Sequence, residues 1–229
     1  MADETSDQAV LTTLTTEHFT LAGARSQTVS EAGTRSALYL GTLSSALISL
    51  GFVGQVSQAG ELFRVFALIV LPTVYLLGLF THMRLVESSV EDLLYGRAIN
   101  RIRHYYLEVT GERSRYFLMS GYDDVPGVLR NMGLGTKPSR LQLYLTASAA
   151  IAVVNSVVGG TAVGLGVGIA FEPALGVSVA AGAAFAIASI AALMRISRAR
   201  HVAGREVEVL FPSPRAVSLP ADDTVSADG

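Results

Sequence analysis

Two long runs without a charged residue constrain this chain more than any other feature. Residues 141–171 are 31 consecutive uncharged positions, and after Glu172 a second uncharged run covers residues 173–194. About 20 apolar residues in a helix suffice to cross roughly 30 Å of hydrocarbon, and a domain folded in water has no need of such runs. We therefore predict two membrane-spanning helices, residues 143–168 and residues 173–194, that form a hairpin.

Two further apolar segments lie earlier in the chain. One covers residues 36–56, which carry no charge, and the other covers residues 64–83. The short connection between them forces an antiparallel hairpin. Only 16% of all residues are charged, whereas ordinary soluble domains carry about 25%. The sequence predicts an all-α, polytopic membrane protein in which four transmembrane helices form two hairpins, joined by a cytoplasmic amphipathic helical connector.

The segments outside the predicted spans are polar. Residues 1–16 are acidic and rich in Thr, which predicts disorder, and residues 17–35 predict a cytoplasmic helix leading into the first span. Residues 84–140 form the predicted connector, because apolar positions recur every three or four residues along its first half. Residues 195–229 begin basic and become rich in Pro, Ser and Asp, which predicts a disordered tail.

The distribution of basic residues predicts the orientation of the four spans. Residues 1–35, 82–140 and 195–229 fall on one side of the membrane and hold two, nine and five Lys or Arg residues. The two short loops on the other side hold only Arg64. Because Lys and Arg are enriched in cytoplasmic segments, both termini and the connector should face the cytoplasm, with the protein in the cell membrane.

Small residues recur every four positions along three of the predicted spans. Residues at this spacing share one helix face, and small side chains there let two helix backbones approach closely in lipid. The pattern predicts close helix contacts, either within the chain or between copies in a homo-oligomer. The positions predicted to pack in this way are Gly41, Ser45, Gly160, Gly164, Gly168, Gly176, Ala180 and Ala184.

The sequence offers no catalytic, cofactor-binding or metal-binding pattern. There are no cysteines, which excludes disulfides, zinc-thiolate sites and thiol nucleophiles. The four histidines are scattered and form no metal-binding pair. A net charge of −2 gives no reason to expect a nucleic-acid partner. We expect a protein that is not an enzyme and that holds no cofactor or metal.

Basic and aromatic residues lie close together in one short stretch of the connector, which we call the basic cluster. Residues 97–106 (RAINRIRHYY) place guanidinium groups beside aromatic rings. Such groups bind phosphate and stack on rings, so the cluster predicts contact with an anion or a lipid head group. The alternative is a juxtamembrane basic helix that only fixes topology and rests on acidic lipids. The candidate contact residues are Arg97, Arg101, Arg103, His104 and Tyr105.

Three stretches carry a resemblance to a known group of proteins. Residues 25–50 (RSQTVSEAGTRSALYLGTLSSALISL), residues 100–106 (NRIRHYY) and residues 116–124 (YFLMSGYDD) resemble a family of uncharacterised four-span integral membrane proteins of actinobacteria. More distantly, the layout is similar to membrane effectors of bacterial antiphage signalling. In those effectors a cyclic nucleotide or a partner protein triggers membrane disruption.

Two functions are compatible with these observations. The first is a helical scaffold or partner-binding protein that assembles through its small-residue helix faces, with the lipid bilayer and a cytoplasmic protein as partners. The alternative, which the resemblance implies, is a regulated pore-forming or membrane-perturbing effector triggered at the cytoplasmic side.

Overall fold

The computed structural model describes residues 2–133, 146–203 and 207–214. Within these residues the chain is all-α and contains no strand. Four helices are long and apolar enough to cross a membrane, so the predicted fold class of a four-helix membrane protein is confirmed. The elements are α1 (Ala2–Val56), α2 (Glu61–Thr110), the 3-10 helix η1 (Gly111–Tyr116), α3 (Val125–Asn131), α5 (Ala147–Phe171) and α6 (Leu175–Ala203).

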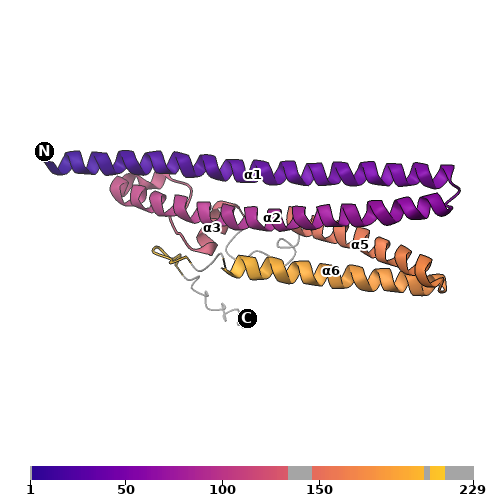
Figure 1. Cartoon of the computed structure of the whole chain (residues 1–229). Helices are drawn as coiled ribbons and strands as arrows, with labels where there is room; N and C mark the ends of the chain where they lie inside the picture. The colour runs from indigo at the N-terminus through magenta and orange to yellow at the C-terminus, as the bar shows by residue number, and fades with distance from the viewer. Residues whose placement is uncertain (1, 134–145, 204–206, 215–229) are drawn as a thin grey trace, which may run out of the picture.

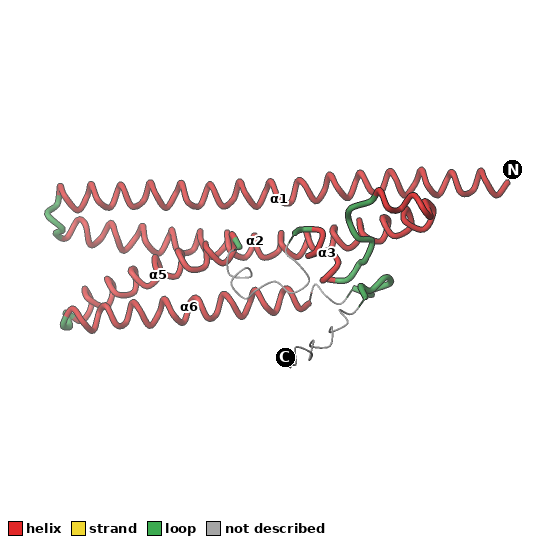
Figure 2. The backbone as a smooth tube through the Cα atoms, turned by 180° about the vertical axis from the view of Figure 1, so that it is seen from behind, coloured by secondary structure: helices red, strands yellow, loops and turns green. Residues whose placement is uncertain are grey.

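The four long helices form two antiparallel hairpins, α1–α2 and α5–α6, that lie alongside each other (Figure 1). Both hairpin turns lie at one end of the molecule, and the N-terminus of α1 lies at the other end. α2 is central, because it packs against α1 on one side and against α5 and α6 on the other. Figure 2 shows the same order of helices from behind, with α1 at the periphery.

α1 is one continuous helix of 55 residues, about 80 Å long at ~1.5 Å per residue. The expectation of a disordered segment at residues 1–16, followed by separate helices at residues 17–35 and 36–56, is therefore wrong from Ala2 onward. Four threonines of the first segment donate their hydroxyls to carbonyls four residues earlier, so these groups are satisfied within the helix: Thr12, Thr13, Thr15 and Thr16. The long contact with α2 offsets the weak helix propensity of the two glycines, Gly23 and Gly33.

α2 continues past residue 83, the end of the predicted second span, into the first half of the predicted helical connector. It runs without a break to Thr110, and Gly111, whose φ is 51°, ends it. The charged halves of the first hairpin, residues 2–35 of α1 and residues 84–110 of α2, form a two-helix extension that we call the stalk. Ion pairs join the two helices there, because α1 and α2 carry opposite charges at facing positions.

The predicted helical connector, residues 84–140, is helical only in part. After η1, residues 117–124 return along α2 without regular structure, and α3 follows. Asp124 caps α3, since its Oδ1 accepts a hydrogen bond from the Gly127 amide at 2.8 Å. Residues 134–140 lie outside the described residues.

The second hairpin begins with Thr146, whose hydroxyl accepts a hydrogen bond from the Ala149 amide at 3.3 Å. Its turn passes through Glu172 in a left-handed conformation, with φ of 45°. α6 then extends to Ala203, well beyond the predicted end of the span at residue 194. The basic stretch that begins at residue 195, for which we predicted no particular structure, is therefore helical as far as Ala203.

Part of the predicted disordered tail has a defined structure. Residues 207–214 follow an irregular path with defined contacts to the stalk, so they are not disordered as we expected. Residues 215–229, which the same prediction covered, lie outside the described residues, as do residues 143–145 at the start of the predicted third span.

The apolar core lies where α2 meets its neighbours. Large apolar side chains of α1 and α2 interlock with two from α5, and no charged residue belongs to this cluster. Because α1 contributes only one face to the core, its other faces remain exposed. The buried core residues are Tyr39, Leu43, Leu50, Ala67, Leu71, Val74, Leu85, Ile151 and Val158.

Candidate functional site

The basic cluster of α2 lies against the C-terminal segment. Arg97 is only 2% exposed. It donates from Nε to the backbone oxygen of Asp123 at 2.8 Å and from Nη2 to the backbone oxygen of Val207 at 2.7 Å. Arg101 donates from Nε to the Asp123 carboxylate at 2.5 Å and from Nη2 to the backbone oxygen of Glu208. We call this arrangement the stalk site: Arg97, Arg101 and His104 of α2 with Asp123 and Asp124.

Asp123 is the most enclosed acidic group of the stalk site, with 0% exposure. Besides Arg101, its two carboxylate oxygens accept the amides of Leu210 at 3.2 Å and Phe211 at 2.8 Å. Burial acts to raise the pKa of Asp123, but the hydrogen bonds from Arg101, Phe211 and Leu210 outweigh it and hold that pKa below its usual value. Asp123 is therefore a charged anchor for the segment.

Two further contacts complete the stalk site. The His104 ring stacks on the Phe211 ring, with centroids 3.7 Å apart and planes inclined by 16°. One Asp124 oxygen accepts the Ser213 amide at 2.9 Å and the Ser213 hydroxyl at 2.5 Å. The site therefore contacts the segment from Val207 to Ser213.

Of the five predicted contact residues, the structure brings Arg97, Arg101 and His104 together at this site. Arg103 instead donates to Asn100 Oδ1 at 2.8 Å and lines a hollow beside α1 with His18. Its burial, and next the charge of Arg25, lower the pKa of Arg103. Tyr105 lies edge-on to the neighbouring Tyr106 ring, outside the site.

The arginines predicted to contact an anion or a lipid head group already have acceptors within the chain. Two of the guanidinium groups already donate to Asp123 and to the backbone of residues 207–208. An incoming phosphate would compete with these acceptors for the same N–H groups. The contact with an anion or head group stays a prediction.

Sequence reasoning missed the acidic half of the stalk site. Asp124 had a local signal, because an Asp two residues before Pro126 is typical of a helix N-terminus. Asp123 had none, because its partners lie 22 residues earlier, at Arg101, and 88 residues later, at Phe211. A contact that spans such distances leaves no periodicity to detect.

α5 and α6 approach each other through small residues, as predicted for α5 but not for α6. A Cβ added to Gly160 would lie 2.5 Å from the Gly182 carbonyl oxygen, and one added to Gly164 would lie 2.9 Å from the Ser178 carbonyl oxygen. A Cβ added to Gly168 would lie 3.2 Å from the Ser178 hydroxyl, which is a looser contact with a side chain. At Gly160 and Gly164 the helices thus meet backbone to backbone, which a larger side chain would prevent.

The α6 residues predicted to pack do not face α5, so they form no contact within the described chain, and a contact between copies through them stays a prediction. Gly176, Ala180 and Ala184 are exposed, and no atom lies within 4 Å of a Cβ added to Gly176. The face that meets α5 is offset by two residues and carries Ser178 and Gly182. α6 has small residues on both faces, so the spacing alone could not select one.

The predicted packing residues of α1 are exposed as well. Gly41 and Ser45 lie on the side of α1 opposite Leu43, which packs against α2. No atom lies within 4 Å of a Cβ added to Gly41. Together with Ala37 and Ser49, which are also exposed, they form what we call the α1 small-residue face. It is not a contact within the described chain.

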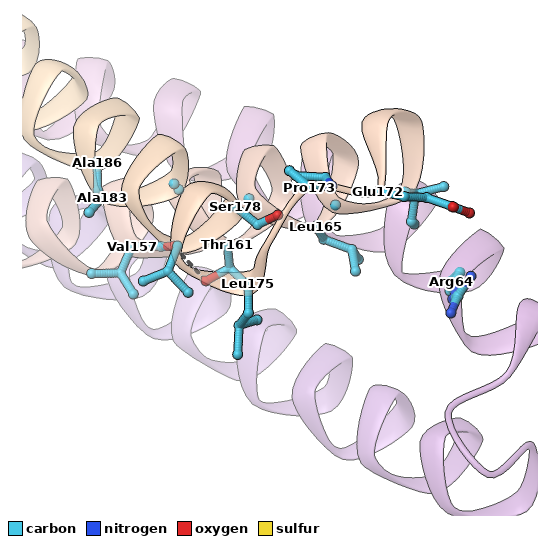
Figure 3. Close-up of a pocket in the computed structure, with 16 residues that line it drawn as sticks. Arg64, Val157, Thr161, Leu165, Glu172, Pro173, Leu175, Ser178, Ala183 and Ala186 are labelled. Atoms are coloured by element: carbon cyan, nitrogen blue, oxygen red, sulfur yellow. Dashed lines mark hydrogen bonds between the residues drawn. The ribbon is translucent and has the colours of Figure 1, made fainter.

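A groove of about 840 Å³ opens between α5 and α6 (Figure 3). Its floor is made by the close contact of the two helices, and Arg64 and Glu172 lie at the end near the hairpin turns. The Thr161 hydroxyl on its wall donates a hydrogen bond to the Val157 carbonyl at 2.9 Å. The remaining lining is apolar or small, so the groove offers shape and apolar contact rather than reactive groups.

Polar side chains also link the two hairpins inside the bundle. The Tyr39 hydroxyl donates to Asn155 Oδ1 at 3.1 Å, and Asn155 is fully buried. His82, which falls at the end of the predicted second span, is also buried, with its ring nitrogens 2.9 Å from the Ser148 carbonyl and 3.1 Å from the Ser197 hydroxyl. These contacts tie α1 and α2 to α5 and α6.

In the part of the chain that the structure describes, no group of three or more His, Asp or Glu side chains could hold a metal ion. No family model, curated protein or solved structure matches the chain.

Proposed function

We propose that this chain is a multi-pass protein of the cell membrane, with both termini cytoplasmic, and that it serves as a helical scaffold. Copies of it associate through the α1 small-residue face, and the stalk presents its surface to a cytoplasmic protein partner. We assign it no catalytic role and no nucleic-acid partner. The observation that carries the proposal is that the α1 small-residue face points away from α2 and meets no other described element.

The chemistry of this face supports packing between helices. In lipid, helices associate through close contact, and small residues allow that contact. The Ser45 hydroxyl already donates to the Gly41 carbonyl at 3.0 Å, and the Ser49 hydroxyl donates to the Ser45 carbonyl at 2.9 Å. Because these hydroxyls already form hydrogen bonds within α1, the face is better suited to packing against a second helix than to lining a water-filled pore.

The test is self-association of the full chain in lipid, measured by fluorescence energy transfer between differently labelled copies. Gly41→Leu should weaken association by about tenfold, since it separates the two backbones. Gly51→Leu is the matched control, because Gly51 is also exposed with no atom near its Cβ but lies on another side of α1. Equal association of wild type and both variants would refute the proposal.

The proposed orientation has a separate test that uses the absence of cysteine. Ser57 lies after α1 at the hairpin turn, and Ser114 lies in η1 beyond the stalk end of α2. On intact cells, an impermeant thiol reagent should label Ser57→Cys and leave Ser114→Cys unlabelled. The reverse pattern would place the stalk outside the cell.

A second candidate function is a membrane-perturbing effector whose trigger is the stalk. The observation in its favour is that the C-terminal segment, three residues beyond α6, is held by the basic cluster of α2. Induced expression should then depolarise cells for wild type but not for a variant with Arg97, Arg101 and Arg103 changed to Ala. An undisturbed membrane potential in both strains would rule the effector out.

A further inference from the structure

The C-terminal segment is held in part through its backbone. The successive amides of Leu210 and Phe211 both point at the Asp123 carboxylate, as in the concave arrangements of backbone N–H groups that bind anions. In return, the Asp123 amide donates to the Phe211 carbonyl at 3.1 Å. This pairing would accept many sequences, because it involves no side chain of the segment.

The two arginines hold the start of the same segment. Arg97 and Arg101 donate to the carbonyl oxygens of Val207 and Glu208, so these are hydrogen bonds from charged guanidinium groups to the backbone. These contacts are again independent of side-chain identity. The stalk site therefore recognises a run of backbone groups with charged side chains on both sides of it.

Two side chains of the segment add selectivity. Phe211 stacks on His104, and Ser213 donates its hydroxyl to Asp124. Pro212, between them, has no N–H to satisfy and restricts the backbone. The site thus selects an aromatic residue followed, two positions later, by a residue with a hydroxyl group.

The segment adds little to the apolar core. Val209 is 42% exposed and Leu210 is 50% exposed, so apolar burial contributes little to its docking. What holds it is a set of charge-assisted hydrogen bonds, which another peptide with the same groups can form equally well.

We infer that the stalk site is a peptide-binding site and that residues 207–214 are its built-in, exchangeable ligand. Its other ligands are short peptides that carry an aromatic residue and, two positions later, Ser or Thr. Such a peptide on a cytoplasmic partner displaces the segment from the stalk, while the end of α6 keeps its own contact with α2, between His201 Nε2 and the Ser89 hydroxyl at 3.0 Å. This inference goes beyond the proposed scaffold function and does not depend on association through α1.

The experiment measures binding of a fluorescein-labelled peptide, residues 207–214 (VEVLFPSP), to the full chain in lipid nanodiscs. In wild type the attached segment competes for the site. Ser213→Glu places a carboxylate against Asp124 and releases the segment, and Phe211→Ala with Ser213→Ala releases it without added charge. Both variants should bind the peptide about tenfold more tightly than wild type does, because the stalk site is unoccupied in a larger fraction of the chains.

Three controls make this result specific. Val209→Ala in the chain should leave peptide binding as in wild type, because that side chain is 42% exposed and the contacts of the stalk site fall on the residues before and after it. A labelled peptide with Ala in place of Phe should bind neither released variant. Adding Arg101→Gln to the Ser213→Glu chain should remove the gain, with circular dichroism confirming that the helices remain.

Two results would overturn the inference. One is equal peptide binding by wild type and both released variants, which would mean that the segment is not an exchangeable ligand. The other is a gain that survives Arg101→Gln, which would place the peptide somewhere other than the stalk site.

Discussion

The two hairpins use small residues in opposite ways. In the α5–α6 hairpin, Gly160 meets the Gly182 backbone, so the glycines are the contact itself. In the α1–α2 hairpin, large side chains such as Tyr39 and Leu43 make the contact, and the small residues of α1 face outward. The comparison teaches that regularly spaced small residues do not by themselves reveal whether a helix face packs within its own chain.

The largest effect should come from filling the α5–α6 contact. Gly182→Val forces a side chain against the Gly160 carbonyl, and overpacking of this kind costs about 1–3 kcal/mol. The melting temperature in detergent should therefore fall by up to about 10 °C. Gly176→Val, on the exposed face of α6, is the control and should leave it nearly unchanged. Similar losses for both variants would mean that α6 is rotated relative to α5.

The stalk supplies a third kind of contact, based on charge, and its test is pH. Because the pKa of Asp123 is lowered in the folded chain, its contribution is complete above the ordinary value of about 3.9 and is lost as the pH falls through the lowered value. A spin label at Val209→Cys should report a docked segment from about pH 7 to pH 5 and a free one only well below about pH 4. Release between pH 6 and pH 5 would contradict this assignment.

A smaller effect is expected where the hairpins meet through Tyr39 and Asn155. Hydrogen bonds between membrane helices contribute about 0.6 kcal/mol on average. Tyr39→Phe and Asn155→Ala should each lower the melting temperature by about 1–2 °C, and the double variant should lose less than the sum. Fully additive losses would show that the two side chains do not act together.

The smallest effect should come from the ion pair between the stalk helices. Arg25 Nε lies 2.7 Å from the Asp92 carboxylate, and both side chains are partly exposed. Arg25→Gln should cost no more than about 0.5 kcal/mol, and the difference should vanish in about 1 M salt. A loss that is large or independent of salt would contradict the assignment of this pair as a weak, solvent-screened contact.

Much of the fold followed from the sequence because its causes are local. The uncharged runs specify which segments enter lipid, short connections make neighbouring spans antiparallel, and Gly111 ends α2. The helix over residues 2–16 was missed because its composition is typical of disorder. There, threonine hydroxyls satisfy themselves within the helix, which composition does not reveal.

The site was predicted only in part because its causes are distant in the chain. The arginines of α2 were found as a basic cluster, but their acceptors lie on Asp123 and on residues 207–208. Likewise, Ser178 and Gly182 lie two residues away from the predicted α6 face. Both faces of α6 have small residues at the same period, and only the packing of α5 selects between them.

Cysteine crosslinking of the α1 small-residue face tests the central claim most directly. Ser45 lies on that face, whereas Leu47, which is 53% exposed, lies toward the other side of α1. In native membranes, oxidation should link copies that carry Ser45→Cys and leave copies with Leu47→Cys largely unlinked. Equal linkage of the two variants, or none at residue 45, would show that the face meets lipid alone and would contradict assembly through α1.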